Sequence, residues 1–186
     1  MNRRPQGART ARPLLVVVTG LPGTGKSTVA EAIADQLQAP VLAHDWAMSG
    51  LRPFPEVQAA LDDMEPSGHR AVGWSILNAL ARAQLREWRS VVLDGVARSP
   101  EIEDCRESAR SEAARLVVVA TQCSDPAVHR SRIEVRRRRI PNWYELDWNR
   151  VERSLATWDQ PAGADLCLDT ASSWEDNLAR LHALFA

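Results

Sequence analysis

The chain has 186 residues, enough for one domain with a full hydrophobic core. Apolar residues make up 45% of it, charged residues make up 25%, and the formal net charge is −1. Because binding to long nucleic acid by charge requires a clear basic excess, this balance does not favour such a partner. The longest apolar runs have five or six residues, so no segment of the ~20 residues needed to span a bilayer is present.

Cysteines and the N-terminal residues bear on the cellular compartment. The three cysteines are widely separated and lack metal-ligand spacing. Residues 1–12 contain four arginines and no apolar run, so they are not a secretory signal. An odd number of cysteines without such a signal favours a reducing compartment, and we expect a cytoplasmic location. We predict a disordered basic tail over 1–12 and one domain over 13–186.

The first predicted elements along the chain are a strand, a glycine-rich loop and a helix. Residues 14–18 are continuously apolar and rich in β-branched side chains, which predicts a buried parallel strand. Residues 20–27 complete the phosphate-loop motif G-x-x-x-x-G-K-S, and helical spacing of apolar residues follows over 27–37. This order predicts a site for the phosphates of a nucleoside triphosphate, with ATP and Mg²⁺ as the expected ligands.

Each part of the loop has a chemical role. Glycines let backbone N–H groups point inward, and the helix N-terminus adds partial positive charge. Lys26 is the only lysine in a chain with 22 arginines, and it is expected to reach the β- and γ-phosphates. Ser27 is expected to supply a hydroxyl to Mg²⁺. The predicted nucleotide-binding residues of this segment are Gly20, Pro22, Gly23, Thr24, Gly25, Lys26, Ser27 and Thr28.

A short strand over 41–43 leads directly to His44 and Asp45. Ligands of open parallel sheets bind at the carboxyl edge, so Asp45 is a candidate base that takes a proton from an attacking hydroxyl. The alternative is a helix cap or a surface aspartate, and we interpret His44 as structural. Prolines then interrupt the chain over 46–67, where only a short helix over 56–64 is predicted.

The next elements are a helix over 69–88, a strand over 91–94 that ends on Asp94, and a helix over 100–114. A carboxylate at the end of this strand holds magnesium in P-loop proteins, usually through water, although it could also merely cap a loop.

Two arginines are candidates for binding the acceptor. Arg52 follows Asp45, and Arg98 follows the strand that ends at Asp94. A hydroxyl-bearing substrate with a negative group would explain both of them. They could instead pair with Glu56 and Glu101.

A strand over 116–120 precedes a helix that begins at Asp125-Pro126 and is predicted to run into four arginines at 136–139. Arg132 and Arg136 are four residues apart and would share a face of that helix. The arginines could form a mobile lid over the transferring phosphoryl group, or a solvated face or nucleic-acid patch. The position before the last strand favours a lid at about 136–149, with Arg132 and Arg136 as its active arginines.

The chain ends with a helix over 147–157, a strand over 165–169 and a helix over 173–185, in which Trp174, Leu178, Leu181 and Leu184 are predicted to face inward. Strands and helices thus alternate throughout. This pattern predicts a single-domain α/β fold with a parallel sheet and helices on both faces.

Several of these segments together carry a family resemblance. Residues 19–37, Asp45 with Arg52, the Leu-Asp-Gly of the third strand and the segment 123–136 resemble the small P-loop kinases of the AAA_33 or zeta-toxin/polynucleotide-kinase-like group, over roughly 14–185. The resemblance implies a nucleoside-kinase-like fold with strand order 2-3-1-4-5. It also implies that Asp45 is the general base, that Arg136 contacts the transferred phosphate and that Arg132 lies near the nucleotide base.

The resulting hypothesis is an ATP- and Mg²⁺-dependent kinase that phosphorylates a hydroxyl of a small molecule, such as a metabolite, a nucleoside, a sugar or an antibiotic. The first alternative is a nucleotide-binding ATPase or switch that acts through a protein partner. The second is a polynucleotide 5′-hydroxyl kinase, although the acidic residues within 46–68 do not match the basic acceptor channel of such enzymes.

Overall fold

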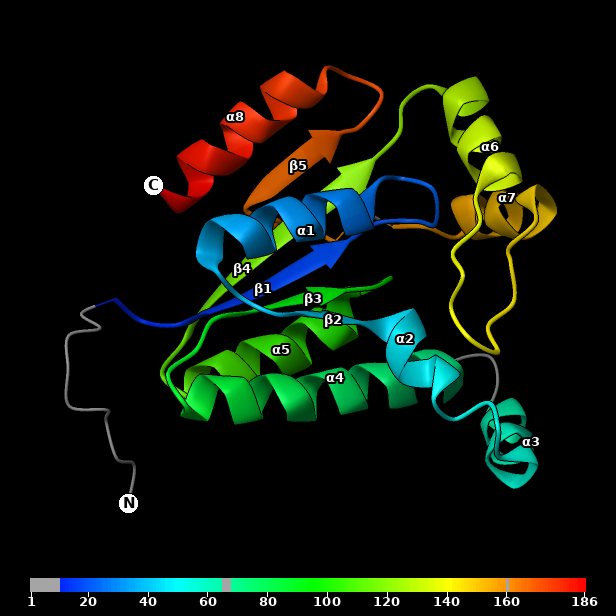
Figure 1. Cartoon of the computed structure of the whole chain (residues 1–186), viewed down its shortest axis with the longest axis horizontal. Helices are drawn as coiled ribbons and strands as arrows, with labels where there is room; N and C mark the ends of the chain where they lie inside the picture. The colour runs from blue at the N-terminus through cyan, green and yellow to red at the C-terminus, as the bar shows by residue number, and fades with distance from the viewer. Residues whose placement is uncertain (1–10, 65–67, 160) are drawn as a thin grey trace.

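The computed structural model describes residues 11–64, 68–159 and 161–186 (Figure 1). Most of the predicted tail, residues 1–10, lies outside the described residues. Five strands form one parallel sheet in the order β2-β3-β1-β4-β5, which confirms the predicted order. The strands are β1 (Leu14–Thr19), β2 (Val41–Ala43), β3 (Val91–Asp94), β4 (Arg115–Gln122) and β5 (Leu166–Asp169).

Helices cover both faces of the sheet, so its central strands are apolar on both sides. Helices α1 (Lys26–Leu37) and α8 (Trp174–Phe185) lie on one face, and α4 (Gly68–Arg86) and α5 (Ser99–Ser111) lie on the other (Figure 1). Alternate residues of β1 enter the two cores: Leu15 and Val17 pack in the cluster that includes α4 and α5, and Val16 and Val18 pack in the cluster that includes α1.

The remaining helices lie beyond the carboxyl ends of the strands (Figure 1). They are α2 (His44–Ser49), α3 (Pro55–Asp63), α6 (Pro126–Val135) and α7 (Trp148–Ala156). Among the described residues, no helix is both long enough and apolar enough to cross a membrane. The carboxyl ends of the five parallel strands, the phosphate loop and the chain between α6 and α7 lie on the same side of the molecule (Figure 1).

The structure corrects three predictions. Helix α2 was not predicted; its N-cap is Ala43, which has no capping side chain, and the buried Met48 holds it in the fold. Helix α6 ends at Val135 and does not run into residues 136–139, because Arg136 is already in an extended conformation. Trp174 does not face inward, since 41% of its surface is exposed.

Candidate active site

The loop between β1 and α1 has the backbone that the motif predicts. Gly20 has φ 149°, and a Cβ there would lie 2.3 Å from the carbonyl oxygen of Thr121. Gly25 has φ 79° and is the N-cap of α1. Only glycine fits such positions without strain. The Thr24 side chain is buried, and its hydroxyl donates to the Leu21 carbonyl oxygen (2.7 Å), so it stabilises the loop from within.

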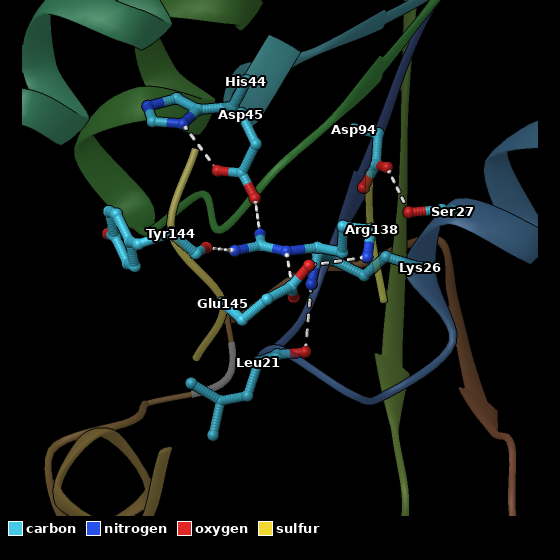
Figure 2. Close-up of polar contacts among 9 residues, drawn as sticks. All are labelled: Leu21, Lys26, Ser27, His44, Asp45, Asp94, Arg138, Tyr144 and Glu145. Carbon is cyan, nitrogen blue, oxygen red and sulfur yellow. Dashed lines mark hydrogen bonds and ion pairs between the residues drawn. The ribbon is translucent and has the colours of Figure 1, made fainter. Parts of the chain in front are cut away.

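Lys26 lies inside the phosphate loop. Its Nζ donates one hydrogen bond, to the Leu21 carbonyl oxygen at 3.0 Å, which leaves its remaining N–H bonds for another acceptor (Figure 2). Burial lowers the pKa of Lys26, although Asp94 and Asp45 act in the opposite direction. The ammonium is thus held close to two carboxylates, at the place where the motif requires a cation for the phosphates.

Asp94 and Ser27 have the chemistry of a magnesium site. Ser27 Oγ donates to Asp94 Oδ2 at 2.7 Å, and Asp94 Oδ1 is buried with no hydrogen-bond partner in the part of the chain that the structure describes. A buried, unsatisfied carboxylate oxygen beside a hydroxyl suits a hard cation that prefers oxygen ligands. Among the described residues no group of three or more His, Cys, Asp or Glu could hold a metal. The two oxygen ligands from Ser27 and Asp94 fit Mg²⁺ that takes its other ligands from phosphates and water.

Asp45 lies at the start of α2, with a partner on each carboxylate oxygen (Figure 2). His44 Nδ1 lies 3.5 Å from Asp45 Oδ1, and the Arg138 guanidinium donates to Asp45 Oδ2. Burial acts to raise the pKa of Asp45, but the hydrogen bond from His44 and the positive charges of Arg138 and Lys26 together hold it below its ordinary value. Asp45 is therefore ionised at neutral pH and able to accept a proton.

Arg138 was not selected from the sequence, yet it makes the most contacts of the four consecutive arginines. Its side chain is almost fully buried, and it extends between Asp45 and Glu145 (Figure 2). Its Nη2 donates to the Tyr144 carbonyl oxygen at 2.6 Å, and its Nε lies 3.6 Å from Glu145 Oε2. Arg138 thus connects the segment between α6 and α7, here called the lid segment (136–147), to the candidate base.

The lid segment is not helical: Arg136 has an extended backbone, and Arg139 has a positive φ of 52°. Arg136, Arg138 and Ile140 are partly buried, whereas Arg137 and Arg139 are exposed. The predicted helix would have separated Arg136 from Arg138, which is why Arg138 was missed. Burial and the neighbouring Arg138 lower the pKa of Arg136, while Asp45 and Asp94 act in the opposite direction.

Two cavities meet at the phosphate loop. The larger, of about 1120 Å³, contains Asp45 and Asp94 in its lining, and the smaller, of about 580 Å³, is lined by Gly23, Gly25 and Thr28. Three side chains line both of them: Lys26, Ser27 and Arg136. Of the predicted loop residues, Pro22 lines the larger cavity, and Gly20 and Thr24 line neither.

Arg132 lies on the wall of the smaller cavity, apart from Asp45. Its guanidinium donates to Thr170 Oγ1 at 2.7 Å and to the Thr170 carbonyl oxygen at 2.8 Å. The exposed apolar side chains of Val135 and Trp174 line the same cavity. Arg132 and Arg136, which were predicted to share one helix face, are thus separated: Arg132 belongs only to the smaller cavity, and Arg136 lies where the two cavities meet.

Arg52 and Arg98 both line the larger cavity, and neither pairs with the glutamate that was the alternative partner. Glu101 forms its ion pair with Arg70 (2.7 Å) and accepts only the backbone N–H of Arg98. Arg52 Nη1 donates to Gln58 Oε1 at 3.0 Å. Within the described residues, no carboxylate forms an ion pair with either guanidinium.

His129 is a further residue that the sequence did not identify. It is buried, and its Nε2 lies 2.7 Å from the carbonyl oxygen of Pro22 in the phosphate loop. Its ring also packs edge-on against Trp148, with ring centroids 5.3 Å apart. A lone histidine inside a helix has no pattern that would reveal this contact. Helices α6 and α7 are joined through it to the phosphate loop.

The chain is similar to known proteins in sequence and in fold. The family model AAA_33, described as an AAA domain, matches residues 15–161. A UPF0200 protein from Aeropyrum pernix is 37% identical over 98 residues, which are 48% of this chain and 50% of that protein. The match thus spans about half the length of this curated relative.

Solved structures of low sequence identity share the fold. Kti12 of Chaetomium thermophilum, in complex with ADP-AlF3, has a TM-score of 0.68 at 19% identity, covering 93% of this chain and 95% of that one. A gluconokinase from Sinorhizobium meliloti has 0.67 at 21%, covering 93% and 91%. The Mycobacterium tuberculosis APS kinase CysC, in complex with AMPPNP and APS, has 0.62 at 19%, covering 94% and 98%. Since the family model covers most of the described chain, the chain belongs to the AAA_33 family of AAA domains and has the fold of the P-loop kinases.

Proposed function

We propose that this chain is a kinase that transfers the γ-phosphoryl group of ATP to a hydroxyl of a small molecule. One observation carries the proposal: Lys26, Ser27 and Arg136 line both cavities, and Asp45 lines only the larger one. A nucleotide bound in the smaller cavity would present its phosphates to these shared residues. An acceptor bound in the larger cavity would place its hydroxyl near these phosphates and beside the Asp45 carboxylate.

The chain's own residues divide the reaction between them. The acceptor oxygen attacks the γ-phosphorus, the bond from that phosphorus to the bridging oxygen breaks, and ADP and a phosphate ester result. Asp45 takes the hydroxyl proton, and His44 and Arg138 orient its two oxygens. Lys26 and Arg136 neutralise the charge on the transferring group. Ser27 and Asp94 would hold Mg²⁺, which would neutralise phosphate charge when bound.

The ligands and names of the related structures support phosphoryl transfer as the proposed reaction. AMPPNP and APS are bound together in the APS kinase, and ADP-AlF3 is bound in Kti12. A gluconokinase and a shikimate kinase have the same fold. Their acceptors differ, so the acceptor of this chain has to be inferred from its own cavity.

The test is Asp45→Asn, with Asp62→Asn as a matched control. Both aspartates line the larger cavity, but Asp62 is exposed and lies 3.0 Å from His69. Transfer from [γ-³²P]ATP to a panel of hydroxyl compounds should fall about 10²- to 10⁴-fold in Asp45→Asn, the usual contribution of a general base. ATP affinity, measured by calorimetry, should stay near that of the wild type, and Asp62→Asn should keep full transfer.

Three results would contradict the proposal. Full transfer by Asp45→Asn would show that Asp45 is not the general base. ATP turnover that no small alcohol changes would favour a nucleotide-dependent switch that acts through a protein partner. Transfer confined to oligonucleotide 5′-hydroxyls, with steep dependence of binding on salt, would instead identify a polynucleotide kinase.

A further inference from the structure

The larger cavity contains unsatisfied hydrogen-bond donors away from the phosphate loop. Arg98 Nε is buried and has no hydrogen-bond partner among the described residues, and Nη1 of this side chain donates to the Thr157 carbonyl oxygen at 3.3 Å. The indole Nε1 of Trp143 is also buried and likewise has no partner in the described part of the chain. Both side chains line the larger cavity. Buried donors are nearly always paired in folded proteins, so both indicate a ligand that accepts hydrogen bonds.

The charged side chains that line the larger cavity favour an anionic ligand over a neutral one. Arg70 and Arg138, which line the same cavity, have carboxylate partners in Glu101 and Asp45. Arg52, Arg98 and Arg150 line it too, and none of them forms an ion pair with a carboxylate of the described chain. The chain as a whole carries a net charge of −1, so this cluster does not reflect general basicity.

Aromatic rings hold two of these guanidiniums in place. The Arg52 guanidinium lies 5.4 Å from the ring centroids of both Trp143 and Tyr144, and that of Arg150 lies 4.8 Å from the Tyr144 ring. Trp143 and Tyr144 are themselves stacked, with centroids 5.0 Å apart. A planar guanidinium stacked on a ring keeps its N–H edge available for an oxyanion.

We propose that the acceptor carries, besides its hydroxyl, an oxyanion group that binds to Arg98 and the indole N–H of Trp143, with Arg52 and Arg150 supplying further positive charge. The inference rests on the proposed function only in calling the ligand an acceptor. Phosphate, sulfate and carboxylate groups share the chemistry that a guanidinium recognises, and the experiment below separates tetrahedral from planar anions.

The binding test uses the full chain saturated with Mg²⁺ and AMPPNP, so that the phosphate loop is occupied. Sodium sulfate represents a tetrahedral anion, sodium acetate a carboxylate, and sodium chloride at equal ionic strength is the baseline. Tryptophan fluorescence reports binding, because Trp143 belongs to the site. We expect saturable binding of sulfate or acetate that Arg98→Gln weakens about tenfold or more, as the loss of a charge-assisted hydrogen bond predicts.

Arg106→Gln is the matched control, since Arg106 lies on α5, the helix that Arg98 precedes as N-cap, and pairs with Glu103 on the exposed surface. It should bind the anions as the wild type does. Arg150→Gln, on α7, gives a second variant should Arg98→Gln fail to fold. A response no larger than that of chloride, or wild-type affinity in both Arg98→Gln and Arg150→Gln, would overturn the anion subsite.

The transfer assay gives an independent result with acceptors that share one skeleton. Glucose, glucuronate and glucose 6-phosphate have the same pyranose ring and differ only at C6, which carries a hydroxyl, a carboxylate or a phosphate. If any is phosphorylated, the anionic compound should have the lower KM, and Arg98→Gln should raise that KM while leaving kcat near its wild-type value. A neutral compound phosphorylated as well as its anionic partner would overturn the subsite and leave the kinase proposal standing. Anion binding that depends on Arg98, without transfer to any hydroxyl compound, would support the anion subsite and overturn the kinase proposal.

Discussion

Gly73 gives the sharpest test of the arrangement around Asp45, although it touches no ligand. A Cβ built on Gly73 would lie 2.2 Å from His44 Nε2 and 2.5 Å from His44 Cδ2. The imidazole cannot simply retreat, because it is mostly buried and packs near Trp74, with ring centroids 6.3 Å apart. A Cβ on Gly95 would lie 2.9 Å from His44 Cβ, so this side is also close-packed. Gly73→Ala should therefore displace the His44 ring and with it the contact to Asp45.

Two opposing effects set the size of the stability change. Alanine in place of glycine within a helix stabilises by about 1 kcal/mol. Overpacking a filled site costs about 1–3 kcal/mol. The overlap with His44 Nε2 is far inside any normal contact, so the cost should be at the upper end, and the net destabilisation of Gly73→Ala should be about 1–2 kcal/mol. Gly50→Ala is the control, because Gly50 has φ −65° and only the Ala47 carbonyl oxygen, 3.4 Å away, is near its Cβ position.

The first readout is the imidazole itself. His44 Nδ1 faces Asp45, and Nε2 faces Gly73 without a partner, so the neutral ring should carry its proton on Nδ1. Long-range ¹H–¹⁵N spectra distinguish this tautomer, and His44→Ala identifies the His44 signals among those of the four histidines. The Nδ1–H pattern should be lost in Gly73→Ala and kept in Gly50→Ala. An Nε2–H tautomer in the wild type would mean that Nδ1 does not donate to Asp45, and the predicted effect of Gly73→Ala would then have no basis.

The second readout is transfer with a responsive acceptor. Misplacing a catalytic group by about 1 Å can cost about 10²-fold, so kcat should fall by about 10- to 100-fold in Gly73→Ala while ATP affinity is unchanged. In a His44→Ala background, Gly73→Ala should have no further effect on kcat, because the ring it displaces is absent. Additive losses in the double variant would show that Gly73 acts by another route.

Three further predictions concern the carboxylates and Arg138. Asp94→Asn should weaken ATP binding about tenfold or more with Mg²⁺ and leave it unchanged with EDTA, as calorimetry would show; equal loss in both would exclude a metal role. Because the pKa of Asp45 is lower in the folded than in the unfolded chain, its carboxylate stabilises the fold at neutral pH and loses this effect as pH falls below about 4. The difference in Tm between wild type and Asp45→Asn should therefore narrow from pH 7 to pH 3, and a constant difference would contradict the shift. Arg138→Gln removes a charge that lowers this pKa, so the acid limb of the pH–rate profile should move to higher pH, with Arg138→Lys in between.

The fold could be predicted from the sequence because local and long-range information agree there. The run of β-branched residues in β1, the phosphate motif and the helical spacing of α1 follow one another without a gap. Strands that are apolar on both faces require helices on both faces, and this requirement favours the observed layers. Asp94 could be placed for the same reason: a carboxylate at the end of a buried strand has to lie at the sheet edge.

A lid was predicted at about 136–149, but its conformation and helix α2 could not be predicted, because contacts distant in sequence decide them. Four consecutive arginines after a helical run look like a continuation of that helix. The segment is not helical, and the guanidinium of Arg138 donates to Asp45, which lies 93 residues earlier in the chain. Likewise α2 begins without a capping side chain. In both cases the residues that fix the conformation lie on other elements of the fold, so the spacing of neighbouring residues in the sequence does not reveal them.

The arginines of the larger cavity show how binding and stability are connected in this fold. Arg70 and Arg138 have carboxylate partners, whereas Arg52, Arg98 and Arg150 have none among the described residues. Like charges that line one cavity repel one another, and a buried donor without an acceptor destabilises the fold by about 1–3 kcal/mol. A ligand that supplies the missing negative charge removes both penalties at once. Part of the free energy of acceptor binding would thus come from relief of a strained electrostatic arrangement, so the unliganded protein should be the less stable state.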